Sequence, residues 1–135
     1  MHFLDTSILL YSISGDPVDA PKREISVELL NRDDGALSLQ ILQDFYVQAT
    51  RISRRDRISH ELAIGLIEAW SRFPVQDTTM TILWGAMEIR SRHHFSYWDS
   101  AVLAAARALG CSELFSEDMS HGRVVDGVRI TNPFL

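Results

Sequence analysis

Four acidic residues stand where predicted strands end or predicted helices begin, although they lie far apart in the chain. Asp5 and Asp118 each follow a short apolar strand, and Asp44 and Asp99 lie on helices that start just after predicted turns. An open parallel α/β sheet gathers strand ends and helix starts at one edge, where its ligands bind. The four carboxylates could therefore converge at that edge.

Converging carboxylates repel one another. Two unit charges about 4 Å apart repel by about 4 kcal/mol at an effective dielectric constant of about 20. Protons or a cation relieve this repulsion, and at neutral pH a divalent cation is favoured because Mg²⁺ and Mn²⁺ prefer oxygen ligands. The residue types therefore predict a metal site.

The elements that must position these acids alternate along the chain. Short strands are expected over residues 2–4, 36–39 and 113–116, and helices over 19–31, 41–49, 59–72, 81–91 and 96–109. Residues 124–130 form either a closing strand pair or a single edge strand. Strands that alternate with helices predict an α/β domain with a mainly parallel central sheet.

The bulk composition fits one domain that spans residues 1–135. Its 46% hydrophobic and 23% charged residues are ordinary for a globular protein that buries a core. No apolar run approaches the roughly 20 residues of a membrane span, and no signal peptide is recognised. Cys111, the single cysteine, is expected to be a buried thiol, so the expected location is the reducing cytoplasm.

Five short segments carry a resemblance to a known family. They are FLDTS (3–7), LQDFY (42–46), YWDSA (97–101), FSEDM (115–119) and TNPF (131–134). In this order and spacing they resemble the PIN domain family, and more narrowly the VapC-type toxin ribonucleases of bacterial type II toxin–antitoxin pairs. The resemblance covers nearly the whole chain. It implies a PIN-like three-layer fold, with a central mainly parallel sheet flanked by helices.

The resemblance also implies an activity, that of a metal-dependent endoribonuclease. Its catalytic acids would be Asp5, Asp44, Asp99 and Asp118, and one or two Mg²⁺ or Mn²⁺ ions would be held by Asp5, Asp99 and Asp118. Such an ion activates a water molecule for attack on the RNA phosphodiester. The implied partners are RNA, a cognate antitoxin that covers the acidic site, and a second copy in a homodimer, with no membrane partner.

Three hydroxyl residues beside the acids complete the implied site. Thr6, Ser7 and Ser116 would orient water next to the metal. Glu117 is the alternative to Asp118 as the fourth acid and is otherwise expected to be solvated.

Asp44 departs from the family pattern, in which this position is usually glutamate. Aspartate is shorter by one C–C bond, about 1.5 Å, and metal–oxygen distances tolerate far less error than that. The alternative function is therefore a catalytically weakened PIN-like module that binds RNA or protein. A receiver-like phosphoryl-transfer domain is disfavoured, because no second aspartate lies two residues after Asp5 and no lysine follows a late strand.

Two of the acids also have simpler roles. Aspartate suits turns, which could explain Asp5. Ser96 and Asp99 have the spacing of a capping box, which could place Asp99 at a helix start for purely structural reasons. Trp98, beside Asp99, is expected to anchor this helix.

The basic residues are few and clustered. A net charge of −5 argues against a protein that grips nucleic acid by bulk positive charge. Arg51, Arg54 and Arg55 crowd at the end of a predicted helix, where arginines offset the helix dipole. Alternatively they contact the RNA backbone, as could His121 in the loop after the fourth acid. Exposed apolar residues within 81–90 and the C-terminal aromatic residues are candidates for a dimer surface.

Overall fold

A six-stranded sheet forms the middle layer of the computed structural model, which describes residues 1–135. Its spatial order is β3-β2-β1-β4-β6-β5. The strands are β1 (His2–Leu4), β2 (Gly35–Ser38), β3 (Val75–Gln76), β4 (Glu113–Phe115), β5 (Val124–Val125) and β6 (Val128–Thr131). Every neighbouring pair is parallel except β5 and β6. The predicted mainly parallel sheet is therefore confirmed.

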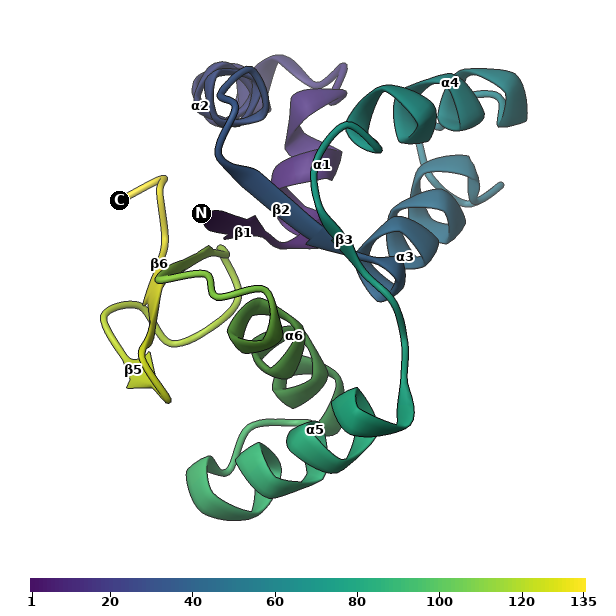
Figure 1. Ribbon diagram of the computed structural model, residues 1–135. Coiled ribbons are helices and arrows are strands. Elements are labelled where there is room, and N and C mark those ends of the chain that lie inside the picture. The colour runs from purple at the N-terminus through teal and green to yellow at the C-terminus, as the bar shows by residue number, and fades with distance from the viewer.

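Helices cover both faces of this sheet. They are α1 (Thr6–Ser12), α2 (Ala20–Leu30), α3 (Leu39–Thr50), α4 (His60–Trp70), α5 (Met80–His93) and α6 (Tyr97–Ala108), with the short 3₁₀ helix η1 (Pro17–Asp19) before α2. Figure 1 shows α1 and α2 on one side of the strands and α5 and α6 on the other. The three-layer α/β architecture expected from the sequence is confirmed. No helix has the length and apolar character that crossing a bilayer requires.

Side chains at the strand–helix junctions explain where the helices begin. Asp5, Ser38, Ser59 and Ser96 each accept a hydrogen bond from a backbone amide in the first turn of α1, α3, α4 and α6, respectively. Such caps satisfy amides that have no partner inside the helix. Two of these caps fix the backbone of candidate site acids. Asp5 is such an acid itself, and Ser96 caps the helix that carries Asp99.

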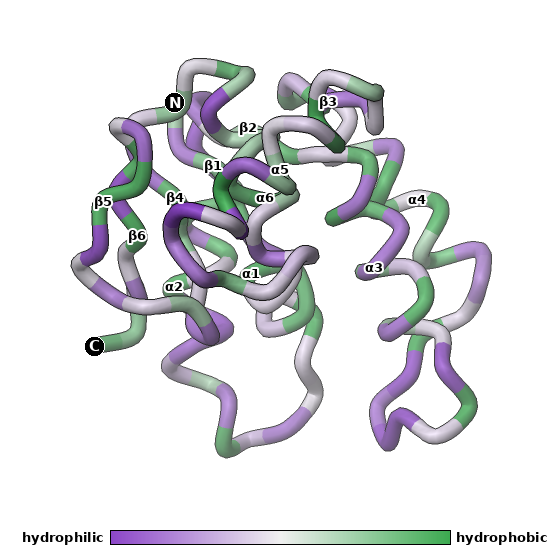
Figure 2. The backbone as a smooth tube through the Cα atoms, turned by 90° about the horizontal axis from the view of Figure 1, so that it is seen from below, coloured by the Kyte–Doolittle hydropathy of each residue, from purple (hydrophilic) through white to green (hydrophobic).

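The core lies between the sheet and its helices. Phe3 and Leu4 of β1 and Leu114 of β4 are almost completely buried, as parallel strands covered on both faces must be. Phe45 of α3 is also fully buried and packs edge-on against the Trp70 ring, with centroids 4.8 Å apart. In Figure 2 the central strands contain hydrophobic residues, whereas the loop between α3 and α4 is mostly hydrophilic. The central strands are thus buried where they end beside the candidate acids.

The chain closes with a hairpin rather than a single edge strand, which settles the alternative left open by the sequence. Val125 of β5 pairs with Val128 of β6, and only Asp126 and Gly127 lie between them. Both turn residues have positive φ (48° and 86°), as a tight Asp-Gly hairpin turn requires. The Asp126 carboxylate also accepts hydrogen bonds from Arg92 and Arg107, which fasten the hairpin to α5 and α6.

Candidate active site

The four acids lie in one open cavity of about 370 Å³, although they come from four separate segments. Asp5 follows β1, Asp118 follows β4, and Asp44 and Asp99 lie on α3 and α6. Because β1 and β4 are parallel neighbours, their carboxyl ends place Asp5 and Asp118 at the same edge of the sheet. The structure therefore brings together the four carboxylates that the sequence singled out.

Asp5 is the most firmly held of the four. Its Oδ1 accepts a hydrogen bond from the Thr6 amide (2.8 Å), and its Oδ2 accepts one from the Ser116 hydroxyl (2.6 Å). The same Ser116 Oγ accepts a bond from the Asp118 amide (3.3 Å). Ser116 thus links the ends of β1 and β4, and Asp5 both caps α1 and faces the cavity.

The electrostatics of Asp5 and Asp99 reflect their shared environment. Burial raises the pKa of Asp5, the hydrogen bonds from Ser116 and Thr6 counteract this, and the charges of Asp99 and Asp118 raise it further. Burial also raises the pKa of Asp99, opposed by its hydrogen bond with Ser96, and the charge of Asp118 adds to the rise. These carboxylates therefore lie close enough for their charges to interact, and a bound cation would relieve that repulsion.

The donor set fits a hard divalent cation. Carboxylate oxygens predominate around the cavity, and the buried Thr6 Oγ1, whose residue lines it, has no hydrogen-bond partner. The arrangement is open rather than a closed cage, because no three His, Cys, Asp or Glu side chains are grouped closely enough to hold a metal ion. A cation here would be bound by side chains that turn toward it or through water.

Asp99 combines a helix-start position with a place in the cavity. The Ser96 hydroxyl accepts a hydrogen bond from the Asp99 amide (3.1 Å), so Ser96 caps α6 as the capping-box spacing predicted. Only this half of the box is formed. The Asp99 carboxylate hydrogen-bonds with no protein side chain other than Ser96, which leaves it available to a ligand in the cavity.

Asp44 is positioned differently from the other three acids. It is exposed on the second turn of α3, and its Oδ1 accepts a hydrogen bond from the Gln48 side chain (2.9 Å) one turn later. Gln48 also lines the cavity. Asp44 therefore lies on the exposed side of α3 at the edge of the cavity, and its carboxylate is turned along the helix.

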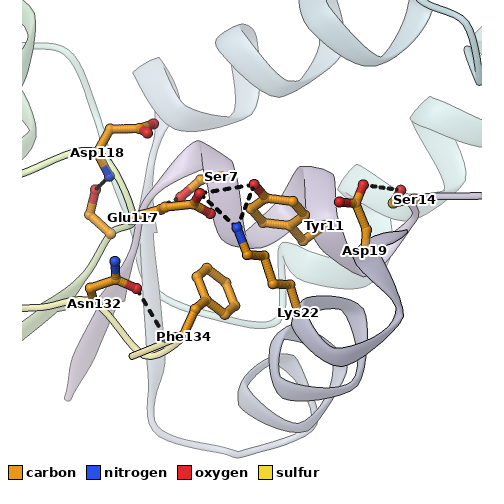
Figure 3. A network of polar contacts seen from close by, with 10 residues as sticks. Ser7, Tyr11, Ser14, Asp19, Lys22, Glu117, Asp118, Asn132 and Phe134 are labelled. Carbon is orange, nitrogen blue, oxygen red and sulfur yellow. Dashed lines mark hydrogen bonds and ion pairs between the residues drawn. The ribbon is translucent and has the colours of Figure 1, made fainter. Parts of the chain in front are cut away.

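Glu117 lines the same cavity and is only partly solvated, since its side chain is 23% exposed and engaged by two other residues. Its Oε1 accepts hydrogen bonds from Lys22 Nζ (2.9 Å) and Tyr11 Oη (3.1 Å), and its amide donates to Ser7 Oγ (3.4 Å). Figure 3 shows this network, with the Asp118 carboxylate lying apart from it. The hydrogen bond to Glu117, and then that to Tyr11, raise the pKa of Lys22. Sequence reasoning missed Lys22 and Tyr11, although Lys22 stands out as the only lysine of the chain.

The predicted RNA-binding residues separate into two groups. Arg54 is the only basic side chain lining the acidic cavity, and its Nε lies 3.1 Å from Asp56. Arg55 lines a second cavity that adjoins the first. Arg51 and His121 line neither, and the His121 ring instead accepts a hydrogen bond from the Asn132 amide (2.9 Å).

Trp98 does not anchor α6, so that prediction is wrong. Its side chain is 66% exposed and contacts the neighbouring Tyr97 ring at 5.0 Å. The helix is held instead by the residues after its first turn, because every residue from Ser100 to Ala106 is buried. Small alanine side chains allow α6 to lie close to the sheet without a large aromatic anchor.

The chain belongs to the PIN domain family, because the model of that family, described as "PIN domain", matches residues 2–126. Among curated proteins, none matches the chain significantly.

Solved structures share the fold at low sequence identity. VapC20 of Mycobacterium tuberculosis, a toxin that cleaves the sarcin–ricin loop, is 19% identical, with a TM-score of 0.66 over 87% of this chain and 90% of that one. A toxin–antitoxin complex from Klebsiella pneumoniae is 19% identical, with a TM-score of 0.72 and 98% of both chains covered. VapBC2 of Rickettsia felis, bound to DNA from its promoter, is 16% identical, with a TM-score of 0.63 and 97% of both chains covered.

Proposed function

We propose that this PIN domain is a metal-dependent endoribonuclease that acts in the cytoplasm as the toxin of a type II toxin–antitoxin pair. The observation that carries the proposal is the convergence of Asp5, Asp44, Asp99 and Asp118 in one cavity at the carboxyl edge of a parallel sheet. Membership of the PIN domain family supports it independently.

Asp5, Asp99 and Asp118 would hold the divalent ion, Mg²⁺ or Mn²⁺, in this proposal. When bound, such an ion neutralises the carboxylates, lowers the pKa of a water molecule and stabilises charge on phosphoryl oxygens. The remaining side chains provide orientation. Ser116 fixes the rotation of the Asp5 carboxylate through its hydrogen bond, and the buried Thr6 hydroxyl beside the cavity has no partner and would reach a water molecule there only by turning.

The RNA strand would reach this cavity beside Arg54. Its guanidinium is held by Asp56 at the junction of the two adjoining cavities, where it can bind a phosphate. A local basic contact of this kind is compatible with a net charge of −5, because the divalent ion would offset part of the negative charge.

The proposed partners follow from the similar structures. One of these is a toxin–antitoxin complex, and the VapC20 toxin cleaves an RNA loop, which supports an antitoxin partner and an RNA substrate here. A homodimer is proposed through the exposed face of α5, where Met80, Trp84 and Met87 are solvent-exposed. Phe134, the C-terminal aromatic candidate for such a surface, is only partly exposed and packs against Tyr11 and Lys22.

Incubation of the purified protein with a mixed RNA pool tests the activity. We expect fragments in Mg²⁺ or Mn²⁺, none in chelator, and none from an Asp5→Asn/Asp99→Asn variant. Asp33→Asn, at an exposed turn residue far from the cavity, is the matched control and should cut like the wild type. Cleavage that survives in the double variant would contradict the proposal.

A catalytically weakened module that binds RNA or protein is the second candidate, and the position of Asp44 favours it. Asp44 is shorter than glutamate and is bonded to Gln48 rather than directed toward the other acids. Failure of the folded wild type to cut any RNA, together with cleavage by an Asp44→Glu variant, would show that Asp44 weakens catalysis and would support this second candidate.

A further inference from the structure

The only lysine of the chain lies beside the acidic cavity. Lys22 comes from α2, whereas the residues around its ammonium come from α1, the segment after β4 and the C-terminal segment. Its Nζ lies 2.9 Å from Glu117 Oε1 and 3.4 Å from Tyr11 Oη, and it lies over the Tyr11 and Phe134 rings, 5.0 and 5.7 Å from their centroids. A compact ammonium with three donors suits this crowded position.

This environment holds Glu117 away from the other acids. Its Oε1 receives both the Lys22 and the Tyr11 hydrogen bonds, and Figure 3 shows the carboxylate directed toward these two residues. Its second oxygen, Oε2, is buried and has no partner. The residue lines the cavity, but this buried oxygen would reach an ion there only if the side chain turned.

The neighbouring carboxylate has the opposite arrangement. Asp118 is exposed, its carboxylate makes no hydrogen bond with the protein, and only its backbone amide is held, by Ser116. Two adjacent acids thus line one cavity, one neutralised by an ion pair and one free. The ion pair is the structural difference between them.

We propose that Lys22 is a positioning residue that withholds Glu117 from the metal and leaves Asp118 as the ligand from this segment. The inference rests on the proposed function, since it concerns the same cavity. Without the ammonium, the Glu117 carboxylate carries a charge held only by the Tyr11 hydrogen bond and can turn its oxygens toward the other acids. The site then gains a negative ligand and binds a divalent ion more tightly.

Calorimetric titration of the metal-free protein with Mn²⁺ tests this without an activity assay. In Lys22→Met we expect Mn²⁺ to bind about threefold to tenfold more tightly, the scale for one unit charge removed from the neighbourhood of a divalent cation near solvent. In Lys22→Met/Glu117→Gln the affinity should return toward the wild-type value. Arg23→Met removes the same charge from the next residue of α2, which is exposed, and should leave the affinity unchanged.

A purely structural role for Lys22 gives a different result. If Lys22 only fastened Phe134 and the C-terminal segment, Lys22→Met would lower the melting temperature and leave Mn²⁺ binding unchanged or weaker, which overturns the inference. Lys22→Gln, which keeps a donor of similar length, replaces Lys22→Met if the latter does not fold by circular dichroism. Absence of Mn²⁺ binding in the wild type would instead overturn the proposed metal site itself.

Discussion

The two sides of the acidic cavity are held in different ways. On the strand side, Asp5 is fixed by two hydrogen bonds, and Ser116 ties it to the segment of Asp118. On the helix side, Asp44 is exposed and has a single hydrogen bond, with Gln48 of its own helix. A carboxylate at the end of a buried strand is placed by the backbone of the sheet, whereas one on a helix surface is placed by its own rotamer. The strand side is therefore preorganised, and the helix side is adjustable.

Loss of the acid on each side should have unequal effects. Asp5→Asn should reduce metal-dependent RNA cleavage by more than about 100-fold, above the 10- to 100-fold range for groups that only support a ligand. Asp44→Asn should reduce the cleavage rate by about tenfold, because the Asp44 carboxylate is exposed and is held only by Gln48 of its own helix. Initial cleavage rates on one RNA at saturating Mn²⁺ measure both. Equal losses would show that the two sides contribute alike.

Removal of the link on the strand side should have an intermediate effect. Ser116→Ala deletes the hydroxyl that joins Asp5 to the Asp118 segment, so Mn²⁺ affinity should fall by about 10- to 100-fold. Calorimetric titration of the metal-free protein measures it. Ser26→Ala is the matched control, since Ser26 is also buried but its hydroxyl has no partner and lies outside the cavity. Unchanged affinity in Ser116→Ala would mean that the link does not position Asp5.

Extension of the acid on the helix side should have a smaller and opposite effect. Asp44→Glu adds about 1.5 Å of reach and should increase cleavage by about tenfold or less. The cleavage rate at limiting Mn²⁺ is the sensitive measure. A decrease would indicate that Asp44 already acts at the correct distance, through water or through movement of α3.

The raised pKa of Asp5 leads to a prediction about stability rather than activity. A carboxyl group whose pKa is raised on folding stabilises the folded state below its unfolded-state pKa, and this stabilisation is lost as pH rises through the folded-state pKa. Asp5→Asn, which cannot ionise, should therefore melt at a higher temperature than the wild type at pH 7 in chelator. The difference should shrink as pH falls toward 4. Asp33→Asn should show no such trend, and a lower melting temperature for Asp5→Asn at pH 7 would contradict the electrostatic account.

Local sequence signals predicted the elements and the four acids, because both depend on short-range chemistry. Ser59 and Ser96 begin helices as expected, and Asp5 and Asp118 follow strands whose apolar residues are easily recognised. The interactions that distinguish Glu117 from Asp118 were not predictable in this way. Lys22 and Glu117 are 95 residues apart, and only the packing of α2 against α1 and the C-terminal segment brings them together.

Exposure was the other quantity that the sequence did not reveal. An aromatic residue next to a site acid suggested an anchor, but Trp98 lies in the first turn of α6 and is 66% exposed, although Ala101 and Ala105 on the same helical face are buried. The arginine cluster shows the same limit. The equal candidates for contact with RNA in the sequence were Arg51, Arg54 and Arg55. The turn after α3 brings only Arg54 to the acidic cavity.

Both edges of the sheet end in very short strands, β3 with two residues and β5 with two residues. Unpaired strand edges invite other chains to extend a sheet, and short edge strands prevent this. A binding partner that extends a sheet needs a run of free backbone amides and carbonyls, which neither edge offers. An inhibitor of this protein must therefore bind through side-chain surfaces and grooves, and copies of the protein at high concentration are protected from edge-to-edge aggregation.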